Sequence, residues 1–328
     1  MTQSPPRSPS LPRRAWDWLP TTATRLVRVL AWVSFVMQVL LIATGGAVRL
    51  TASGLGCPTW PQCTAGSVTN TPELGIHGII EFGNRLLTVI LVIVVIVVFV
   101  AMVRMWKTRR DLFVLALLQG ISIPVQAVLG GLTVLSGLNP YVVGAHFVLS
   151  ILLVILTTLL VYRAYRGPRG VIKTAPSWFT ITAHVTSLFV ALTVVFGILT
   201  TGSGPHPGDS LDAKHLAPRN GLNSQVIQTV HSIPAYITVA LTLFLVIAAW
   251  GFARRNVSSQ STRRFTVVML VVEAVQVAVG LVQASLGLPI ALVNIHLVLA
   301  ALLVAAMTAL ILSLRGGPAA SDVTAPTT

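Results

Sequence analysis

Eight long apolar stretches constrain the fold of this 328-residue chain more than any other feature. About 20 helical residues cross a bilayer core of about 30 Å, and each stretch reaches that length. Backbone groups inside lipid must be paired within the protein, which favours helices. A mean hydropathy of +0.85 and 9% charged residues exclude an ordinary soluble domain. We therefore predict transmembrane helices at about 26–49, 76–103, 111–136, 141–163, 177–200, 225–250, 265–287 and 289–314.

The net charge of +14 is distributed as a topology signal and does not indicate a nucleic-acid site. Lys and Arg gather before the first span and between spans two and three, four and five, and six and seven, whereas the opposite loops hold few. The positive-inside rule then predicts a multi-pass protein of the cell membrane with both termini cytoplasmic, in contact with the lipid bilayer. The segments 1–24 and 316–328, rich in small residues and Pro, are expected to be disordered cytoplasmic tails.

The chain contains an internal repeat, because a shift of 150 positions aligns it with itself. The matched pairs include Thr51/Thr201, Ser53/Ser203, Gly54/Gly204, Gln126/Gln276, Gly130/Gly280, Gly137/Gly287, Leu138/Leu288 and His146/His296. Each half has four spans, so both halves have the same orientation. We expect an all-α integral membrane fold made of two tandem four-helix bundles, over residues 25–165 and 166–315, related by an internal pseudo-two-fold axis.

Two histidines of the second half predict a ligand site. His231 and His296 lie at similar depths in spans six and eight. Imidazole inside a membrane bundle is costly unless it is paired or binds something. Two imidazoles facing each other across helices are what a bis-histidine haem site needs. The alternative is that each histidine bonds separately to a neighbouring helix, but His146 repeats the position of His296 in the first half, which favours ligation.

The first half is less regular, because a shift of 147 places Asn84 on His231. His77 lies seven residues earlier on the same helical face, and Glu81 lies between the two. Arg85 follows directly. Charged residues within an apolar helix indicate a functional site by default. The alternative is that Glu81 and Arg85 form an i,i+4 ion pair that makes both tolerable in the membrane.

The two cysteines, Cys57 and Cys63, lie in the loop 50–75 between the first two spans. The charge pattern makes this loop extracytoplasmic, where disulfides persist. We expect a disulfide that either clamps a Pro-rich loop or exchanges with a thiol partner. Elsewhere, Glu273 is a lone acid in span seven, opposite Ile123 in the repeat. It either bonds within the bundle or takes part in proton movement, and the sequence leaves both open.

Several of these motifs together resemble the haem A synthase family, over about residues 26–314. The run at 46–63 reads Gly-Ala-Val-Arg-Leu-Thr-Ala-Ser-Gly-Leu-Gly-Cys-Pro-Thr-Trp-Pro-Gln-Cys. It is followed by Glu81-Phe-Gly-Asn84-Arg85 and by Gln126-Ala-Val-Leu-Gly-Gly-Leu-Thr-Val. The histidines His146, His231 and His296 extend the resemblance.

The resemblance implies roles for individual residues. His231 and His296 would be the axial ligands of a haem B, and His146 would bind the substrate haem O. Cys57 and Cys63 would form the outer disulfide, and Glu81 would be the catalytic acid of a Glu-Xaa-Xaa-His-Arg motif.

The chain departs from that motif, because its histidine is Asn84 here. Either His77 supplies the second ligand of the substrate haem or His146 binds alone, and we favour His77 because it shares a face with Glu81. Arg85 and Arg49 are candidates for contacts with the haem propionates.

The implied reaction is the oxidation of the C8 methyl group of haem O to a formyl group through hydroxylated intermediates, for cytochrome oxidase assembly. Haem O would be delivered by haem O synthase. The electron acceptor, the oxygen source and the oligomeric state, with a homo-oligomer among the options, stay open. The main alternative function is a transmembrane b-type cytochrome that transfers electrons without changing a substrate, although the paired histidines lie only in the outer half of the membrane. A transporter is a second alternative.

Overall fold

The computed structural model describes residues 16–168, 172–209, 217–251 and 259–316. His215 and the parts of the predicted tails at 1–15 and 317–328 lie outside the described residues. The described chain has eight helices that are long and apolar enough to cross a membrane, which confirms the prediction of an all-α membrane protein. They are α2 (Arg25–Leu50), α3 (Gly75–Met102), α4 (Arg110–Leu135), α5 (Pro140–Arg166), α6 (Ser177–Ser203), α7 (Ser224–Gly251), α8 (Gln260–Ser285) and α9 (Ile290–Ser313).

Short elements complete the described chain. Two 3-10 helices flank α3, namely η1 (Pro72–Leu74) and η2 (Val103–Trp106). Strand β1 (Ile172–Lys173) pairs antiparallel with β2 (Arg315–Gly316). This two-residue pairing joins the segment between α5 and α6 to the end of α9.

The same tight turn joins α4 to α5 and α8 to α9. Gly137 and Leu138 both have φ of 60°, and Gly287 and Leu288 have φ of 73° and 63°. Glycine adopts this left-handed conformation without strain. The leucines are held in it by backbone hydrogen bonds, from Leu138 N to Thr133 O at 2.8 Å and from Leu288 N to Gln283 O at 2.7 Å. Each turn makes its two helices antiparallel neighbours, which brings the following histidine beside the preceding helix.

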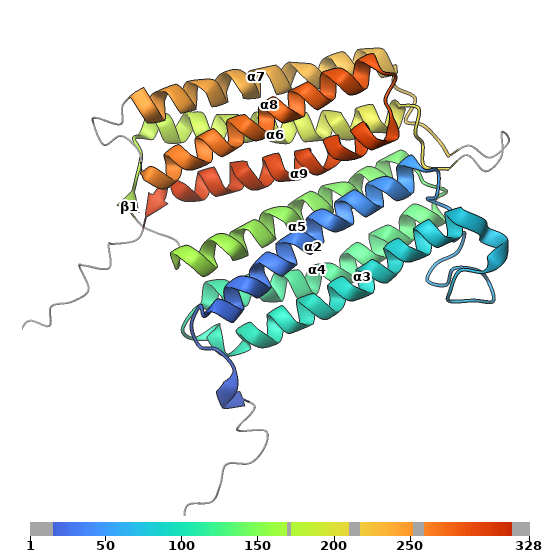
Figure 1. Ribbon diagram of the computed structural model, residues 1–328, viewed down its shortest axis with the longest axis horizontal. Helices are drawn as coiled ribbons and strands as arrows, with labels where there is room; N and C mark the ends of the chain where they lie inside the picture. Colours follow the sequence, from blue (N-terminus) through green and yellow to red (C-terminus); the bar gives the residue numbers. More distant parts are fainter. Residues whose placement is uncertain (1–15, 169–171, 210–216, 252–258, 317–328) are drawn as a thin grey trace, which may run out of the picture.

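The membrane-spanning helices of the described chain form two groups (Figure 1). Helices α2–α5 make one group and α6–α9 the other, and they meet where α9 packs against α2 and α5. Gly46 of α2 permits a close approach there, because a Cβ atom on it would lie 2.5 Å from Asn294 Oδ1 of α9. The grouping agrees with the two predicted halves, and the symmetry between them stays a prediction.

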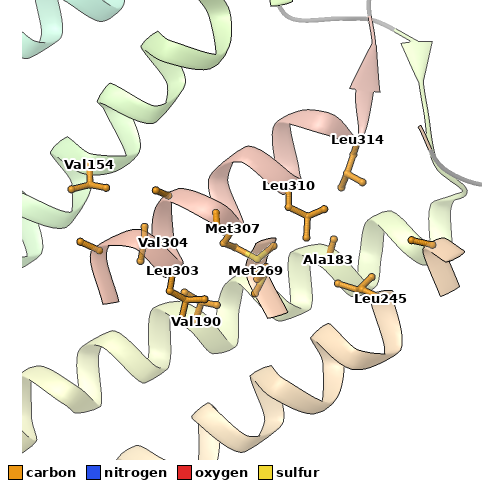
Figure 2. Close-up of a cluster of buried hydrophobic side chains, with 14 of the residues drawn as sticks. Val154, Ala183, Val190, Leu245, Met269, Leu303, Val304, Met307, Leu310 and Leu314 are labelled. Carbon is orange, nitrogen blue, oxygen red and sulfur yellow. The ribbon is translucent and has the colours of Figure 1, made fainter. Parts of the chain in front are cut away.

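The apolar cores lie toward one end of the helices. One core surrounds the C-terminal part of α9 and includes Val190, Leu245, Met269 and Leu310 (Figure 2). The second joins the start of α2 and α4 to the end of α3 and α5. Packing of this kind holds helices together in lipid, where the hydrophobic effect between helices is weak. The opposite ends of the helices are left to carry the polar residues of the candidate site.

Candidate functional site

His231 and His296 face each other across the second half. Their ring centroids are 6.4 Å apart and the rings are inclined by 72°. The Nδ1 atom of His231 lies 2.9 Å from the carbonyl oxygen of Thr193. Because a carbonyl accepts, Nδ1 carries the hydrogen and the lone pair lies on Nε2. Metal-binding imidazoles are commonly oriented by such a bond, so His231 is prepared as a ligand through Nε2.

The spacing and surroundings of this pair fit a haem iron. Imidazole nitrogens lie about 2.0–2.1 Å from a first-row metal such as zinc, so two opposed rings on one ion have centroids roughly 6 Å apart. Gly197 and Gly280 leave room for the rings. A Cβ atom on Gly197 would lie 3.1 Å from His231 Cε1, and a Cβ atom on Gly280 would lie 3.2 Å from His296 Cε1. The donor set, two imidazoles between apolar helices, is that of a bis-histidine haem.

Gln276 of α8 holds the backbone at His296. Its Nε2 donates to the carbonyl oxygen of His296 at 3.2 Å. Its Oε1 atom and His296 Nδ1 are both buried and have no hydrogen-bond partner among the described residues. A ligating imidazole donates its other N–H to an acceptor, so the unpartnered Nδ1 of His296 is a donor that a bound haem would bring into use. Gln276 is matched with Gln126 in the sequence repeat, but its position there gave no sign of a role in the site.

The first half repeats this arrangement around His146. Gln126 Nε2 donates to the carbonyl oxygen of His146 at 3.2 Å, and Gln126 Oε1 and His146 Nδ1 are again buried without a described partner. A Cβ atom on Gly130 would lie 3.3 Å from His146 Cε1. The repeated Gln and Gly positions were therefore the sequence signal that could have identified residues supporting the histidines.

Asn84, which stands where the second half has His231, is hydrogen-bonded to a residue of the adjacent helix α2. Its Oδ1 accepts a hydrogen bond from Thr44 Oγ1 of α2 at 2.7 Å. Its side chain is half-buried. An amide is a poor iron ligand, so the first half offers one imidazole, His146, where the second half offers two.

His77 lies in the first turn of α3, beside the loop that follows α2. Its Nδ1 is 2.9 Å from Ser53 Oγ, and the backbone of Ser53 forms a bridge with Asp209. The described contacts thus associate His77 with the outer loops of both halves. They do not bring it together with His146, and its role as a ligand stays a prediction.

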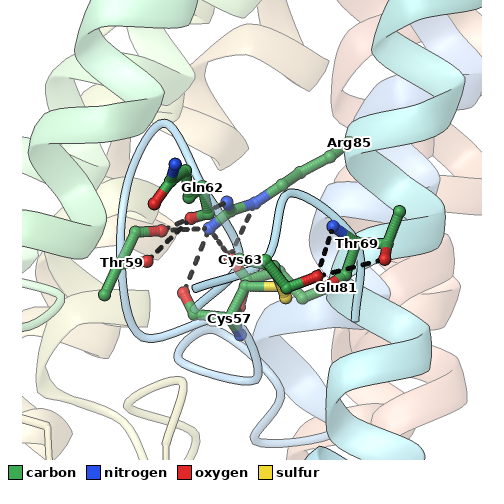
Figure 3. The surroundings of a disulfide bond; sticks show 8 residues. Cys57, Thr59, Gln62, Cys63, Thr69, Glu81 and Arg85 are labelled. Atoms are coloured by element: carbon green, nitrogen blue, oxygen red, sulfur yellow. Dashed lines mark hydrogen bonds and ion pairs between the residues drawn. A yellow bond between two sulfur atoms is a disulfide. The ribbon is translucent and has the colours of Figure 1, made fainter. Parts of the chain in front are cut away.

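Glu81 and Arg85 together anchor the cysteine loop (Figure 3). Cys57 and Cys63 form the expected disulfide. Glu81, which is 5% exposed, accepts a hydrogen bond from Cys57 N at 2.6 Å through Oε2 and pairs with Arg85 Nη2 at 2.6 Å through Oε1. Arg85 also donates to the carbonyl oxygens of Cys57, Thr59 and Gln62 at 3.1–3.2 Å. The i,i+4 ion pair is present, and both its members also hold the loop.

The same loop reaches across the first half to α4. Trp60 packs against Gly131, where a Cβ atom would collide with its indole ring. The neighbouring Gly130 faces the ring of His146. The disulfide loop therefore runs from Glu81 on α3 to the part of α4 that supports His146.

Arg49 joins the two halves at the same end of the molecule. Its Nη2 donates to Thr201 O and its Nε to His206 O, both at 3.1 Å. Gly54 N adds a bond to Gly208 O at 2.9 Å. These contacts use carbonyl groups of the second half, and a propionate contact of Arg49 or Arg85 stays a prediction.

The fold and site together define a helical membrane protein built around half-buried imidazoles, with an opposed pair in one half and a single one in the equivalent place of the other. The chain belongs to the COX15-CtaA family, described as cytochrome oxidase assembly proteins, which it matches over residues 28–308.

Relatives of the chain carry the name Heme A synthase. The protein from Bacillus pumilus is 32% identical over 189 residues, which cover 55% of this chain and 58% of that protein. The protein from Exiguobacterium sibiricum is 30% identical, over 41% of this chain and 46% of its own length. The chain thus spans about half the length of these two relatives. A protein from Listeria monocytogenes is 24% identical over 86% of this chain and 92% of its own length.

Proposed function

We propose that this protein is a haem A synthase, an oxidoreductase that converts haem O to haem A for cytochrome oxidase. Its family and the name shared by its relatives support this function. The observation that carries the proposal is the opposed pair His231 and His296, 6.4 Å apart, beside a half that offers only His146 at the equivalent position. One half is built to keep a cofactor and the other to receive a substrate.

Haem B is held in the second half by His231 and His296. When bound there, haem B supplies reversible one-electron transfer, with a potential set by its ligands and surroundings. Thr193 fixes the ring of His231 through Nδ1, and Gln276 holds His296 through its backbone carbonyl group. Such supporting contacts orient the ligands and raise their basicity.

The substrate haem O is bound in the first half by His146. The sequence leaves two arrangements open, in which the haem iron is bound by His146 alone or by His146 together with His77. The contact of His77 with Ser53 uses Nδ1 and leaves Nε2 free, so it is compatible with both arrangements. A single protein ligand suits a haem that must enter and leave.

Glu81 is the residue that takes up protons released from the C8 methyl group as it is oxidised. Its carboxylate is fixed by the N–H of Cys57 and by the guanidinium of Arg85, so its position does not depend on bound substrate. A positioned base contributes about 10²–10⁴-fold to a rate. Trp60 of the disulfide loop packs against Gly131, next to Gly130, which faces the ring of His146.

The positive-inside rule supports cytoplasmic termini and an extracytoplasmic cysteine loop. Haem O synthase is the expected source of the substrate, and the C8 oxidation proceeds through hydroxylated intermediates. The family assignment favours this synthesis over electron transfer without a chemical product.

Chromatography of the haems extracted with acid from purified protein tests the function. The protein would be produced together with a haem O synthase, with and without Glu81→Gln. We expect haem B together with haem A or a hydroxylated haem O from the unsubstituted chain. Haem B alone, with haem O unchanged, would contradict the proposal and indicate an electron-transfer cytochrome.

A further inference from the structure

The buried face of α8 carries polar side chains from one end of the helix to its middle. Thr262 and Thr266 are fully buried and Glu273 is 2% exposed, and the fully buried Met269 lies on this face between Thr266 and Glu273. Gln276 continues the same face toward His296. At the start of the helix, Thr262 Oγ1 lies 2.9 Å from Ser259 Oγ and 3.1 Å from Ser313 Oγ. We call Thr262, Thr266 and Glu273 the polar stripe of α8.

The first half has no equivalent acid on this face. The repeat places Leu112 and Ala116, both fully buried, opposite Thr262 and Thr266. Ile123 stands opposite Glu273. The polar stripe is therefore a feature of the half that holds His231 and His296, and not a requirement of the bundle.

Glu273 is bonded on one side only. Its Oε1 accepts from Thr242 Oγ1 at 2.9 Å, and its Oε2 is buried with no hydrogen-bond partner among the described residues. Two helices pack against α8, namely α7 and α9. Their titratable groups are His231, Tyr236 and His296, and α8 adds Arg263 and Arg264 near its start.

Glu273 carries the one side-chain carboxyl group on the helices α7, α8 and α9. The ion pairs between described residues involve other acids. An ionised carboxylate in such a place is costly unless a positive charge lies near it.

The position of Glu273 links it to the histidine pair. It precedes Gln276, which bonds to the backbone of His296, by three residues. It precedes Gly280, which faces the His296 ring, by seven residues, or about 10 Å along the helix axis. Its partner Thr242 follows His231 on α7 by eleven residues. The carboxyl group thus lies below the histidine pair, between it and the helix end where Thr262 and Ser259 begin.

We propose that Glu273 takes up one proton when haem B between His231 and His296 is reduced and releases it when haem B is oxidised. This inference rests on the proposed function, which supplies the electron from haem O. A ferric haem carries one more positive charge than a ferrous haem, and that charge stabilises a nearby carboxylate at low dielectric.

The step balances one electron against one proton. On reduction the iron gains one electron, and an O–H bond forms on Glu273 with a proton that comes from water. On oxidation by a one-electron acceptor that bond breaks and the proton leaves.

Potentiometric titration of the purified haem B-containing protein at several pH values tests this coupling. In the unsubstituted protein we expect the midpoint potential to fall as pH rises, by up to about 59 mV per tenfold change in proton activity for one proton per electron. In Glu273→Gln, which keeps the size and the hydrogen bond of the side chain, we expect a smaller dependence. Haem propionates also titrate, but they contribute equally to both proteins.

A redox difference infrared spectrum gives a second readout, which observes the carboxyl group of Glu273 directly without replacing this residue. The unsubstituted protein should show a band of a buried carboxylic acid that gains intensity on reduction and shifts in D₂O. Thr242→Val, which removes the hydrogen bond to Oε1, should move that band. The inference would be overturned if the unsubstituted protein lacked this band, or if the band persisted unchanged in Glu273→Gln.

The two proposals fail in different ways. A purified protein without a bis-imidazole haem spectrum would overturn the proposed haem B site, and this inference with it. A normal haem spectrum with the same pH dependence in Glu273→Gln would overturn the coupling alone and leave the proposed function standing.

Discussion

The carboxylate of Glu81 accepts a hydrogen bond from the backbone N–H of Cys57, with 2.6 Å between oxygen and nitrogen. An acid expected to act in catalysis is thereby joined to a loop closed by a disulfide. Arg85 strengthens the junction, because it pairs with Glu81 and donates to three carbonyl groups of the loop. The position of the carboxylate and the order of the loop therefore depend on each other.

Glu81→Gln should strongly lower haem A formation while both haems still bind. Glutamine keeps an oxygen that can accept from Cys57 N, so the loop is retained, but it is not a base. We expect haem A formation to fall by about 10²-fold or more, measured as haem A per chain after extraction. Glu73→Gln, on an exposed acid of η1, is the matched control. Normal haem A formation by Glu81→Gln would remove Glu81 from the chemistry.

Replacing both cysteines with serine should weaken the loop without emptying the haem B site. Removing a cross-link that closes so short a loop costs about 2 kcal/mol of stability in the chain-entropy account. Glu81 and Arg85 still hold the loop, so we expect a lower melting temperature and an unchanged haem B spectrum. If haem B is lost as well, the loop supports the whole molecule and not the first half alone.

His231→Ala and His296→Ala should each remove the bis-imidazole spectrum of haem B, because each leaves one axial ligand. His146→Ala should keep that spectrum and lose haem O binding. Absorption and electron paramagnetic resonance spectra of the purified variants check both expectations. His184→Ala, on an exposed histidine of α6, is the control. An unchanged spectrum in His231→Ala would place haem B elsewhere.

Gln276→Leu should weaken haem B binding through the orientation of His296. The substitution removes the hydrogen bond that the side chain donates to the carbonyl oxygen of His296. Loss of such a supporting contact typically costs about 10–100-fold in metal affinity. Haem titration of the apoprotein would measure this, and the g values of the low-spin ferric signal should change with the ring orientation. Gln225→Leu, on an exposed position of α7, should bind haem normally.

Gly280→Ala should disturb the same histidine by crowding. Its Cβ atom would lie 3.2 Å from His296 Cε1, so the ring or the helix must move, at a cost of about 1–3 kcal/mol. Gly120→Ala on α4 is a matched control, since its Cβ atom would meet nothing within 4 Å. Thermal unfolding with and without haem separates the two variants. Equal behaviour would show that the space beside His296 is not needed.

The sequence by itself determined the membrane class, the order and length of the eight helices, the disulfide and the residues that are candidates for the haem sites. These properties are local, because span length, charge asymmetry and the spacing of histidines on a helix can be counted along the chain. The shift of 150 positions even contained Gln126 and Gln276, although nothing in the spacing said what they contact.

Tertiary structure alone decided which side chains meet. It placed Gln276 beside His296, bound Glu81 and Arg85 to the cysteine loop, turned His77 toward Ser53 and left one oxygen of Glu273 without a described partner. Each of these contacts depends on how one helix is rotated and packed against another. Hydrophobic periodicity fixes that rotation only to within a broad face, so the partner of a polar side chain emerges only when the helices are assembled.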